Sequence, residues 1–445
     1  MTEVPELHEL EAALREAGPG VLVSARSVAT AFPERPVLLD RLPLPGGSVL
    51  AVLEAGDEVL VVPLAPMHAR DEEPRRAVPG DGAAEGVLEV IRRGEPIGRF
   101  VPSAFAAMPP ARGERAIDVD QSNESTIVGE AVVVKVYPRT TPGPQPGLDL
   151  QVHLAAVGFR ETPAALGTLR WESSGASPVL LAAAAAYLPG ARDGWEWFLE
   201  LVLAALDAGD PEPSLAAAAA TGGLVARLHG ALATPSSVFP TPVADAGHHE
   251  LAAWRARAEA TLEEALALTG GDEGERLREL APAARVALAP LAEMTATPTM
   301  RIHGDLHVGQ VLAWAGGYAI ADFDGDPLAP AAERTARGPI ARDVASFVRS
   351  LDHLGRIAQR RGPASDDRLR DDRVEAWIEQ ARRRFLVAYR GGLGSPHAGL
   401  FDERLLAPLE VAQACHEYVY AARYLPRWLY VPDLALPRLL ARIGS

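Results

Sequence analysis

The sequence predicts an α+β fold with a β-rich N-terminal part and a mainly helical C-terminal part. Short apolar and β-branched runs bounded by turn residues recur up to about residue 188, as in 48–64 and 130–137. Segments with helical periodicity then follow, at 213–232, 249–268, 274–295, 367–390 and 403–425. We therefore expect an N-terminal cap at 1–90, a small lobe at 91–188 and a helical lobe at 189–445.

The cap is expected to contain a short amphipathic helix and several strands. The helix is predicted near residues 6–17, and strands around 20–29 and 48–64, with Gly56-Asp57 as a turn in the second region. Segment 67–85 is rich in Arg, Asp, Glu, Pro and Gly and is expected to be an exposed loop. The cap contains no evident catalytic constellation, so the chemistry is expected further along the chain.

Lys135 stands out in the small lobe, because it is the only lysine among 43 basic residues. It lies in the β-branched run 130–137, which predicts a strand, after a polar turn at 120–125 and a return strand. A compact ammonium group at the end of such a hairpin suits binding to phosphate groups. The alternative interpretation is that Lys135 is simply a solvated residue on a strand.

The segment Arg-Ile-His-Gly-Asp-Leu-His-Val-Gly-Gln at 301–310 indicates phosphoryl transfer. It is followed by Ile-Ala-Asp-Phe-Asp-Gly-Asp at 320–326, and Gly316-Gly317 between them predicts a hairpin turn. In phosphoryl transfer to a hydroxyl, one carboxylate orients the hydroxyl proton, while an amide oxygen and a second carboxylate hold Mg²⁺ against the phosphates. The alternative is that an Asp in this position merely caps a turn.

This segment resembles the catalytic and metal loops of the aminoglycoside-phosphotransferase and choline-kinase superfamily, and is most similar to its maltokinase-like branch. Gln310 replaces the more usual Asn, and the Asp-Phe-Asp-Gly-Asp-Pro run is shared with that branch. The resemblance runs from about residue 115 to the C-terminus and implies a bilobal, protein-kinase-like fold. It implies Asp305 as catalytic base, Gln310 and Asp322 as Mg²⁺ ligands, and Asp324 as an additional ligand.

The same resemblance implies an ATP site in the small lobe. Lys135 would pair with the α- and β-phosphates, and Asp149 would supply the acid that pairs with Lys135. The other expected nucleotide neighbours come from the polar loop and from the strand and hinge that follow: Ser122, Asn123, Ser125, Ala185 and Tyr187. The alanine-rich run at 178–190 is equally compatible with a packing strand that has no ligand role.

The C-terminal segment is the candidate for binding the acceptor. Gln413, His416, Glu417 and Tyr420 are spaced i, i+3, i+4 and i+7, so they share one face of the predicted helix. Polar side chains beside an aromatic ring such as Trp428 are typical of a sugar pocket. A solvated helix face with an aromatic core residue is the alternative.

The acceptor is expected to be an amino sugar. Maltokinases tend to carry an Asp-Lys pair one turn before the Glu, whereas this chain has Ala412-Gln413 and keeps Glu417. This pattern resembles the actinobacterial-type glucosamine kinases and implies ATP-dependent phosphorylation of glucosamine to glucosamine 6-phosphate, with His303 and Asp305 also facing the acceptor. Maltokinase and aminoglycoside phosphotransferase activities stay open, as does a nucleotide-binding regulator without catalysis.

Composition and motif spacing argue against several other classes of protein. The net charge of −16 argues against nucleic-acid and membrane partners, so small molecules are the expected partners. Cys415 is the only cysteine, which fits a reducing compartment, and the N-terminus lacks a signal-peptide pattern. With no apolar stretch of about 18 residues evident, a cytoplasmic location is expected. His303 and His307 are unsuited to a helical zinc motif, because Gly304 disfavours a helix there.

Overall fold

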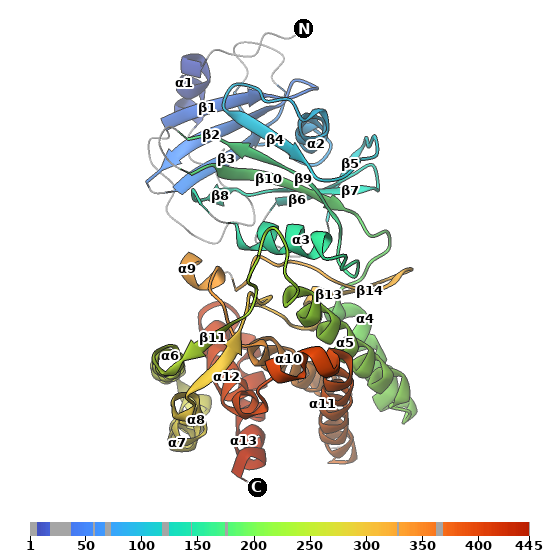
Figure 1. The fold of residues 1–445 in the computed structure, drawn as a ribbon, viewed down its shortest axis with the longest axis vertical. Helices are drawn as coiled ribbons and strands as arrows, with labels where there is room; N and C mark the ends of the chain where they lie inside the picture. The colour runs from blue at the N-terminus through green and yellow to red at the C-terminus, as the bar shows by residue number, and fades with distance from the viewer. Residues whose placement is uncertain are drawn as a thin grey trace. The chain divides into compact units, whose positions relative to one another are not determined.

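The computed structural model divides into two compact units (Figure 1). The first comprises Met1–Gln151 and Pro163–Pro189, and the second comprises Val152–Thr162 and Gly190–Ser445. The structure describes residues 7–17, 37–56, 58–66, 73–117, 124–143, 145–173, 177–326, 329–361 and 368–444. Antiparallel sheets dominate the first unit and helices the second, which confirms the predicted fold class.

A four-stranded antiparallel sheet in the order β1-β2-β3-β8 forms one part of the first unit. Its strands are β1 (Val37–Pro43), β2 (Val49–Ala55), β3 (Glu58–Leu64) and β8 (Arg139–Thr140). Helix α1 (Leu7–Ala17) contributes Leu10 and Leu14 to an apolar cluster that it shares with strands of this sheet. The helix and the strands at 48–64 are as predicted, while the strand predicted at 20–29 lies outside the described residues.

A six-stranded antiparallel sheet in the order β4-β9-β10-β7-β6-β5 forms the other part. Its strands are β4 (Phe100–Ala104), β5 (Glu114–Ala116), β6 (Glu124–Val128), β7 (Val132–Val136), β9 (Ala165–Trp171) and β10 (Val179–Ala186). Helix α2 (Ala83–Arg93) precedes β4, and α3 (Pro146–Ala156) follows β8.

The two sheets and α2 share one hydrophobic core. Leu50 of the first sheet, Val87 of α2 and Val134 of the second sheet belong to the same buried cluster. Strand β8, which follows β7 in the chain, also pairs with β3. The predicted border at residue 90 therefore does not separate two compact units, because the apolar faces on either side of it bury each other.

The second unit contains ten helices in its described part. They are α4 (Gly194–Ala208), α5 (Glu212–Leu232), α6 (His248–Leu268), α7 (Gly271–Leu288), α8 (Pro290–Glu293), α9 (Ala331–Arg334), α10 (Ile340–Arg361), α11 (Arg368–His397), α12 (Leu406–Tyr424) and α13 (Tyr430–Gly444). Two small sheets accompany them, β11 (Ala244–Gly247) with β12 (Ala296–Thr299) and β13 (Val311–Trp314) with β14 (Gly317–Ile320). The helix predicted at 274–295 is divided into α7 and α8, since Pro290 cannot donate a backbone hydrogen bond.

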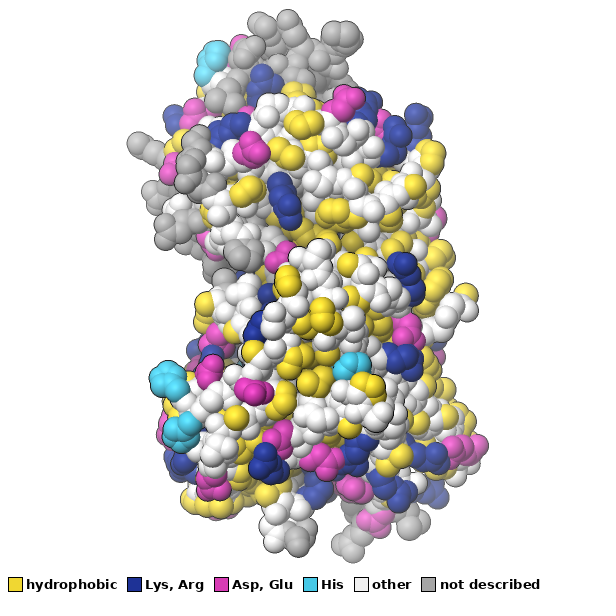
Figure 2. Space-filling model, in the orientation of Figure 1, with side chains coloured by type: hydrophobic (Ala, Val, Ile, Leu, Met, Phe, Trp, Pro, Cys, Tyr) yellow, Lys and Arg dark blue, Asp and Glu magenta, His cyan; other side chains and the backbone are white. Residues whose placement is uncertain are grey.

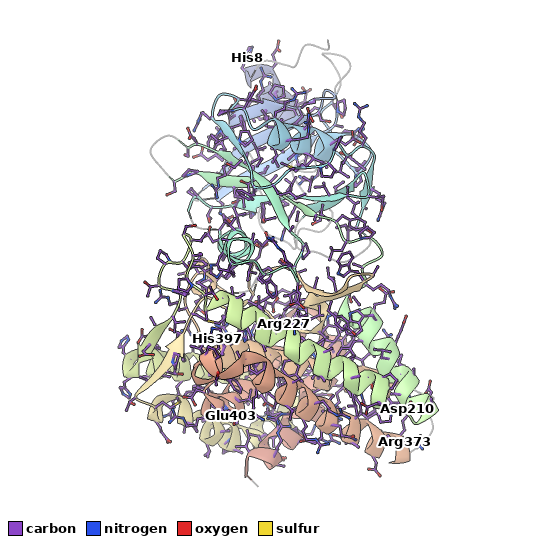
Figure 3. All side chains as sticks on the ribbon, turned by 45° about the vertical axis from the view of Figure 1, so that its right-hand side comes forward. His8, Asp210, Arg227, Arg373, His397 and Glu403 are labelled. Atoms are coloured by element: carbon purple, nitrogen blue, oxygen red, sulfur yellow. The ribbon has the colours of Figure 1, made fainter. Side chains whose placement is uncertain are left out.

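Helices α5 and α11 run side by side in the same direction (Figure 3). Glycine permits their close approach, because a Cβ added at Gly222 would lie 2.3 Å from the carbonyl oxygen of Phe385. Contrary to expectation, α5 is long and apolar enough to cross a bilayer by length and composition alone. However, 61% of its most apolar window is buried, which is typical of a core helix. On the face shown in Figure 2, acidic and basic side chains are interspersed.

Candidate active site

The predicted hairpin is present in the second unit and brings two parts of the site together. Strand β13 pairs with β14 in a register that joins Val311 to Ile320 and Trp314 to Gly317. The 3-10 turn η2 (Val308–Gln310) precedes β13. The carbonyl of Gln310 accepts a hydrogen bond from the N–H of Ala321 at 2.9 Å. The end of the catalytic loop therefore lies beside the start of the acidic run, as the sequence predicted.

Asp305 lies among other carboxylates. Burial, followed by the negative charges of Asp326, Asp322 and Asp343, raises the pKa of Asp305 to about 8. Such a shift requires these carboxylates to be close in space, so the structure gathers the acidic run around the predicted catalytic base. A bound cation or a cationic substrate would relieve this mutual repulsion.

The oxygen donors beside Asp305 suit Mg²⁺. Among the described residues, no group of three or more His, Cys, Asp or Glu side chains is arranged to hold a metal ion by itself. Mg²⁺, however, is usually held by one or two carboxylates together with water and substrate phosphates. The amide of Gln310 and the carboxylates of Asp322 and Asp324 therefore fit a metal held partly by a nucleotide. Asp322 also has a φ of 60°, a strained conformation often found at functional sites.

Asp343 of α10 braces the predicted catalytic loop. Its side chain is 1% exposed and accepts hydrogen bonds from the N–H groups of His303 and Gly304, both at 2.9 Å. His229 Nε2 lies 3.2 Å from the same carboxylate. Burial acts to raise the pKa of Asp343, but these partners outweigh it and lower the pKa. The carboxylate thus stays charged and holds two backbone groups ahead of Asp305.

His303 is not available to the acceptor, contrary to prediction. The side chain is 1% exposed, and its Nδ1 accepts a long hydrogen bond of 3.4 Å from the N–H of Asp305. Its Nε2 lies 2.9 Å from the carbonyl of Ala321, which can accept a hydrogen bond from the ring. Both ring nitrogens are used within the site, so His303 ties the catalytic loop to the acidic run.

One edge of α12 faces the acidic cluster. His416 Nε2 lies 3.7 Å from a carboxylate oxygen of Asp326. Burial, and then the charges of Asp305 and Asp326, raise the pKa of Tyr420. The predicted helical stripe therefore comes near Asp305, the predicted catalytic base, at His416 and Tyr420. Gln413 is partly buried on the same helix, and its contact with an acceptor stays a prediction.

Glu417 and Trp428 have protein partners of their own. Both carboxylate oxygens of the buried Glu417 accept hydrogen bonds from Arg349, at 3.2 and 2.8 Å, and His353 Nε2 lies 3.0 Å away. The ring of Trp428 in η5 (Pro426–Trp428) stacks on Tyr430 at 6.2 Å, beyond the end of α12. Direct acceptor contacts by Glu417 and Trp428 stay predictions.

An aromatic layer that sequence reasoning missed links the catalytic loop to Glu417. The ring of Trp195 lies 5.8 Å from that of His307 and 6.2 Å from that of His353, nearly parallel to the latter. A Cβ added at Gly309 would lie 2.5 Å from Trp195 Nε1, so glycine is required there. The only sequence signal was the Asp-Gly-Trp-Glu-Trp run, which does not identify the partners of Trp195.

In the first unit, Lys135 lies on the face of β7 opposite to the valines that enter the core. It is paired in register with Ser125 of β6 and Ala183 of β10, and Ala185 lies on the same face two residues later. Lys135 Nζ lies 5.3 Å from the ring centroid of Tyr137. The predicted lysine, Ser125 and Ala185 therefore share one face of the sheet.

For the other residues predicted to contact the nucleotide, the contact itself stays a prediction. The backbone N–H of Tyr187 donates to the carbonyl of Ala131 at 2.9 Å, and the contact of backbone groups near Ala185 and Tyr187 with the adenine stays a prediction. Asp149 lies in the first turn of α3, and its pairing with Lys135 stays a prediction. Ser122 and Asn123 lie outside the described residues.

Sequence comparison identifies close relatives, although no family model matches the chain. A glucosamine kinase of Streptacidiphilus jiangxiensis is 46% identical over 374 residues, which cover 82% of this chain and 83% of that protein. A glucosamine kinase of Mycolicibacterium smegmatis (strain ATCC 700084 / mc(2)155) is 38% identical over 408 residues, covering 90% and 98% of the two chains.

Solved structures agree with the sequence comparison. A glucosamine kinase crystal form matches with a TM-score of 0.83 at 39% identity, covering 98% of this chain and 100% of the other. A glucosamine kinase in complex with glucosamine, ADP and inorganic phosphate matches with a TM-score of 0.80 at 40% identity and the same coverage. This identity and coverage, together with the catalytic loop and acidic run, show that the chain belongs to the glucosamine kinase family.

Proposed function

We propose that this protein transfers the γ-phosphoryl group of ATP to the 6-hydroxyl of glucosamine. The observation that carries the proposal is the match, over 98% of the chain, to a glucosamine kinase crystallised with glucosamine and ADP. ADP is what a kinase leaves after ATP has given up its γ-phosphoryl group. The chain keeps an acid, an amide and further acids in the order that this reaction needs.

Asp305 is proposed to position the acceptor hydroxyl and to take its proton. Burial beside Asp326 and Asp322 raises the pKa of Asp305 to about 8, which makes its carboxylate, once deprotonated, a stronger proton acceptor than that of an ordinary Asp. Asp343 accepts hydrogen bonds from the N–H groups of His303 and Gly304, and the ring of His303 accepts one from the N–H of Asp305, which limits the freedom of the base.

The nucleotide is proposed to contact Lys135 and Ser125 through its phosphates. Both side chains lie on the same face of the six-stranded sheet, away from the core. Gln310 and Asp322, with Asp324, would hold Mg²⁺, which when bound neutralises charge on the phosphate oxygens. These assignments need only oxygen donors and one ammonium group, which is what these residues provide.

An amino sugar is the acceptor that suits the surroundings of Asp305. Asp305 and Asp326 place negative charge beside His416 and Tyr420. An ammonium group is attracted to such a field, whereas a neutral sugar gains nothing from it. Hydroxyls of the sugar ring can bond with His416 and Tyr420.

The test is Mg²⁺- and ATP-dependent ADP release with glucosamine, glucose, N-acetylglucosamine, maltose and kanamycin as separate acceptors. We expect turnover with glucosamine, far less with N-acetylglucosamine, whose amine is uncharged, and a loss of about 10³-fold or more in Asp305→Asn. Preferential turnover of maltose or kanamycin would establish one of the rival kinases instead. The absence of ADP release with every acceptor would favour a nucleotide-binding protein without catalysis.

A further inference from the structure

His307 lies between the predicted catalytic base and the predicted metal-binding turn. The residue is the N-cap of η2, and its Nδ1 accepts a hydrogen bond of 3.0 Å from the N–H of Gly309. Its Nε2 lies 3.9 Å from the carboxylate oxygen Oδ2 of Asp305 and 3.4 Å from the amide nitrogen of Gln310. One imidazole ring is therefore close to both groups that the reaction needs.

The ring of His307 is held in place by packing as well as by its hydrogen bond. The indole of Trp195 lies against it, with the ring centroids 5.8 Å apart. The backbone of Gly309 is also close, because a Cβ added there would lie 2.8 Å from Cε1 of His307. A ring fixed in this way keeps Nε2 directed at the same neighbours, which is what a residue that orients a reacting group requires.

The hydrogen bond from Gly309 decides what Nε2 can do. A ring nitrogen that accepts a backbone N–H carries no proton, so the proton of the neutral ring belongs on Nε2. Nε2 is then a donor. The amide nitrogen of Gln310 is a donor too and cannot accept this proton, whereas the carboxylate of Asp305 can. Their separation of 3.9 Å exceeds a hydrogen bond, as is common at catalytic groups before the substrates bind.

We propose that His307 is a positioning residue for phosphoryl transfer, and that its Nε2–H donates to Oδ2 of Asp305 when ATP and the acceptor are bound. This role rests on the proposed kinase function. A side-chain movement of about 1 Å is enough to form the bond. The side chain of Asp305 is 32% exposed, so an acceptor can reach it.

Holding Oδ2 leaves the other oxygen of Asp305 to receive the proton of the acceptor hydroxyl. The hydroxyl oxygen forms a bond to the γ-phosphorus while the bond from that phosphorus to the departing ADP oxygen breaks. The hydroxyl proton passes to Asp305, and His307 keeps its own proton throughout. A base that is itself oriented by a third group is a recurring arrangement in enzymes.

Two substitutions separate this role from a merely structural one. In His307→Asn the side-chain oxygen can replace Nδ1 as acceptor for Gly309, since Asn is a favoured N-cap, but the donor to Asp305 is lost. In His307→Gln the longer side chain can place an amide N–H where Nε2 lies, so the donor is kept while the cap becomes poorer. His249→Asn is the matched control, because His249 is exposed in the first turn of α6.

Steady-state kinetics should be measured with the acceptor that the wild-type protein turns over. We expect His307→Asn to lower kcat by about 10- to 100-fold, through loss of one hydrogen bond to a charged group, while each KM changes less than about twofold. His307→Gln should have a kcat at least about fivefold above that of His307→Asn, and His249→Asn should match wild type. The proposal is overturned if His307→Asn keeps the wild-type kcat, or if His307→Gln is no better than His307→Asn.

The tautomer of His307 provides a test that does not depend on turnover. Long-range proton–nitrogen correlation spectra distinguish a proton on Nε2 from one on Nδ1, and the spectrum of His307→Gln identifies the signals of His307. We expect the proton on Nε2 near neutral pH. A proton on Nδ1 would overturn the proposal, because Nε2 would then accept from Gln310. If no acceptor is turned over, the proposed function fails, and the spectrum still decides whether His307 can donate to Asp305.

Discussion

The ion pair between Glu417 and Arg349 offers a sharp test of how the helical unit is held together. Glu417 lies on α12 and Arg349 on α10, and their side chains are 8% and 3% exposed. Burial acts to raise the pKa of Glu417, but the charges of Arg349 and then His353 outweigh it and lower the pKa from 4.5 to about 2. The pair therefore stabilises the folded state, and Glu417→Gln should remove that stabilisation.

The expected loss follows from the pKa difference. A change from 4.5 to about 2 corresponds to about 3 kcal/mol, and breaking a buried ion pair costs roughly 3–5 kcal/mol. Because the folded-state pKa is the lower one, the contribution is complete above pH 4.5 and is lost as the pH falls towards 2. Glu417→Gln should thus lower the free energy of unfolding at pH 7, with a smaller difference from wild type at pH 3.

Urea unfolding followed by circular dichroism at the two pH values is the assay. Glu403→Gln is the control, because the carboxylate of Glu403 pairs with Arg390 at the surface and such pairs contribute less than about 1 kcal/mol (Figure 3). The reasoning would be refuted if Glu417→Gln unfolded like wild type at pH 7. A tenfold rise in KM for glucosamine with unchanged stability would instead identify Glu417 as a direct sugar contact.

Three further substitutions test the site. Asp343→Asn should leave a backbone N–H of the catalytic loop without its carboxylate acceptor, so urea unfolding should show a loss of about 2–3 kcal/mol together with reduced turnover. Gly309→Ala should place a Cβ 2.5 Å from Trp195 Nε1 and cost about 1–3 kcal/mol, and a wild-type melting temperature would count against this packing. Lys135→Gln should reduce kcat/KM for ATP by about 10- to 100-fold in steady-state kinetics with an unchanged circular dichroism spectrum, since one charge-assisted bond to phosphate is lost.

Much of the local structure could be predicted because it depends on short-range patterns. The apolar alternation at 48–64 and the β-branched run around Lys135 form the expected strands, and the expected hairpin forms with its turn at Ala315-Gly316, one residue before the predicted Gly316-Gly317. The order of Asp305, Gln310 and Asp322 along the chain was similarly informative, because the hairpin alone brings these segments together. Each of these predictions needs only contacts between residues that are near in sequence.

The errors concern contacts between distant residues. His303 was expected to face the acceptor, but its ring is buried against the chain before Asp322. Residue 90 was expected to separate the cap from the small lobe, but the two sheets share one hydrophobic core. In each case the direction of a side chain or backbone group depends on which element packs against it.

By itself the sequence determined the strands, most of the helices and the acid–amide–acid order that indicates phosphoryl transfer, since these follow from local periodicity and motif spacing. Tertiary structure alone decided that Trp195 and His353 connect the loop to Glu417, and that Glu417 pairs with Arg349. These partners lie tens to more than a hundred residues apart in the chain. Their meeting is set by the burial of apolar surface across the whole unit, which no short segment encodes.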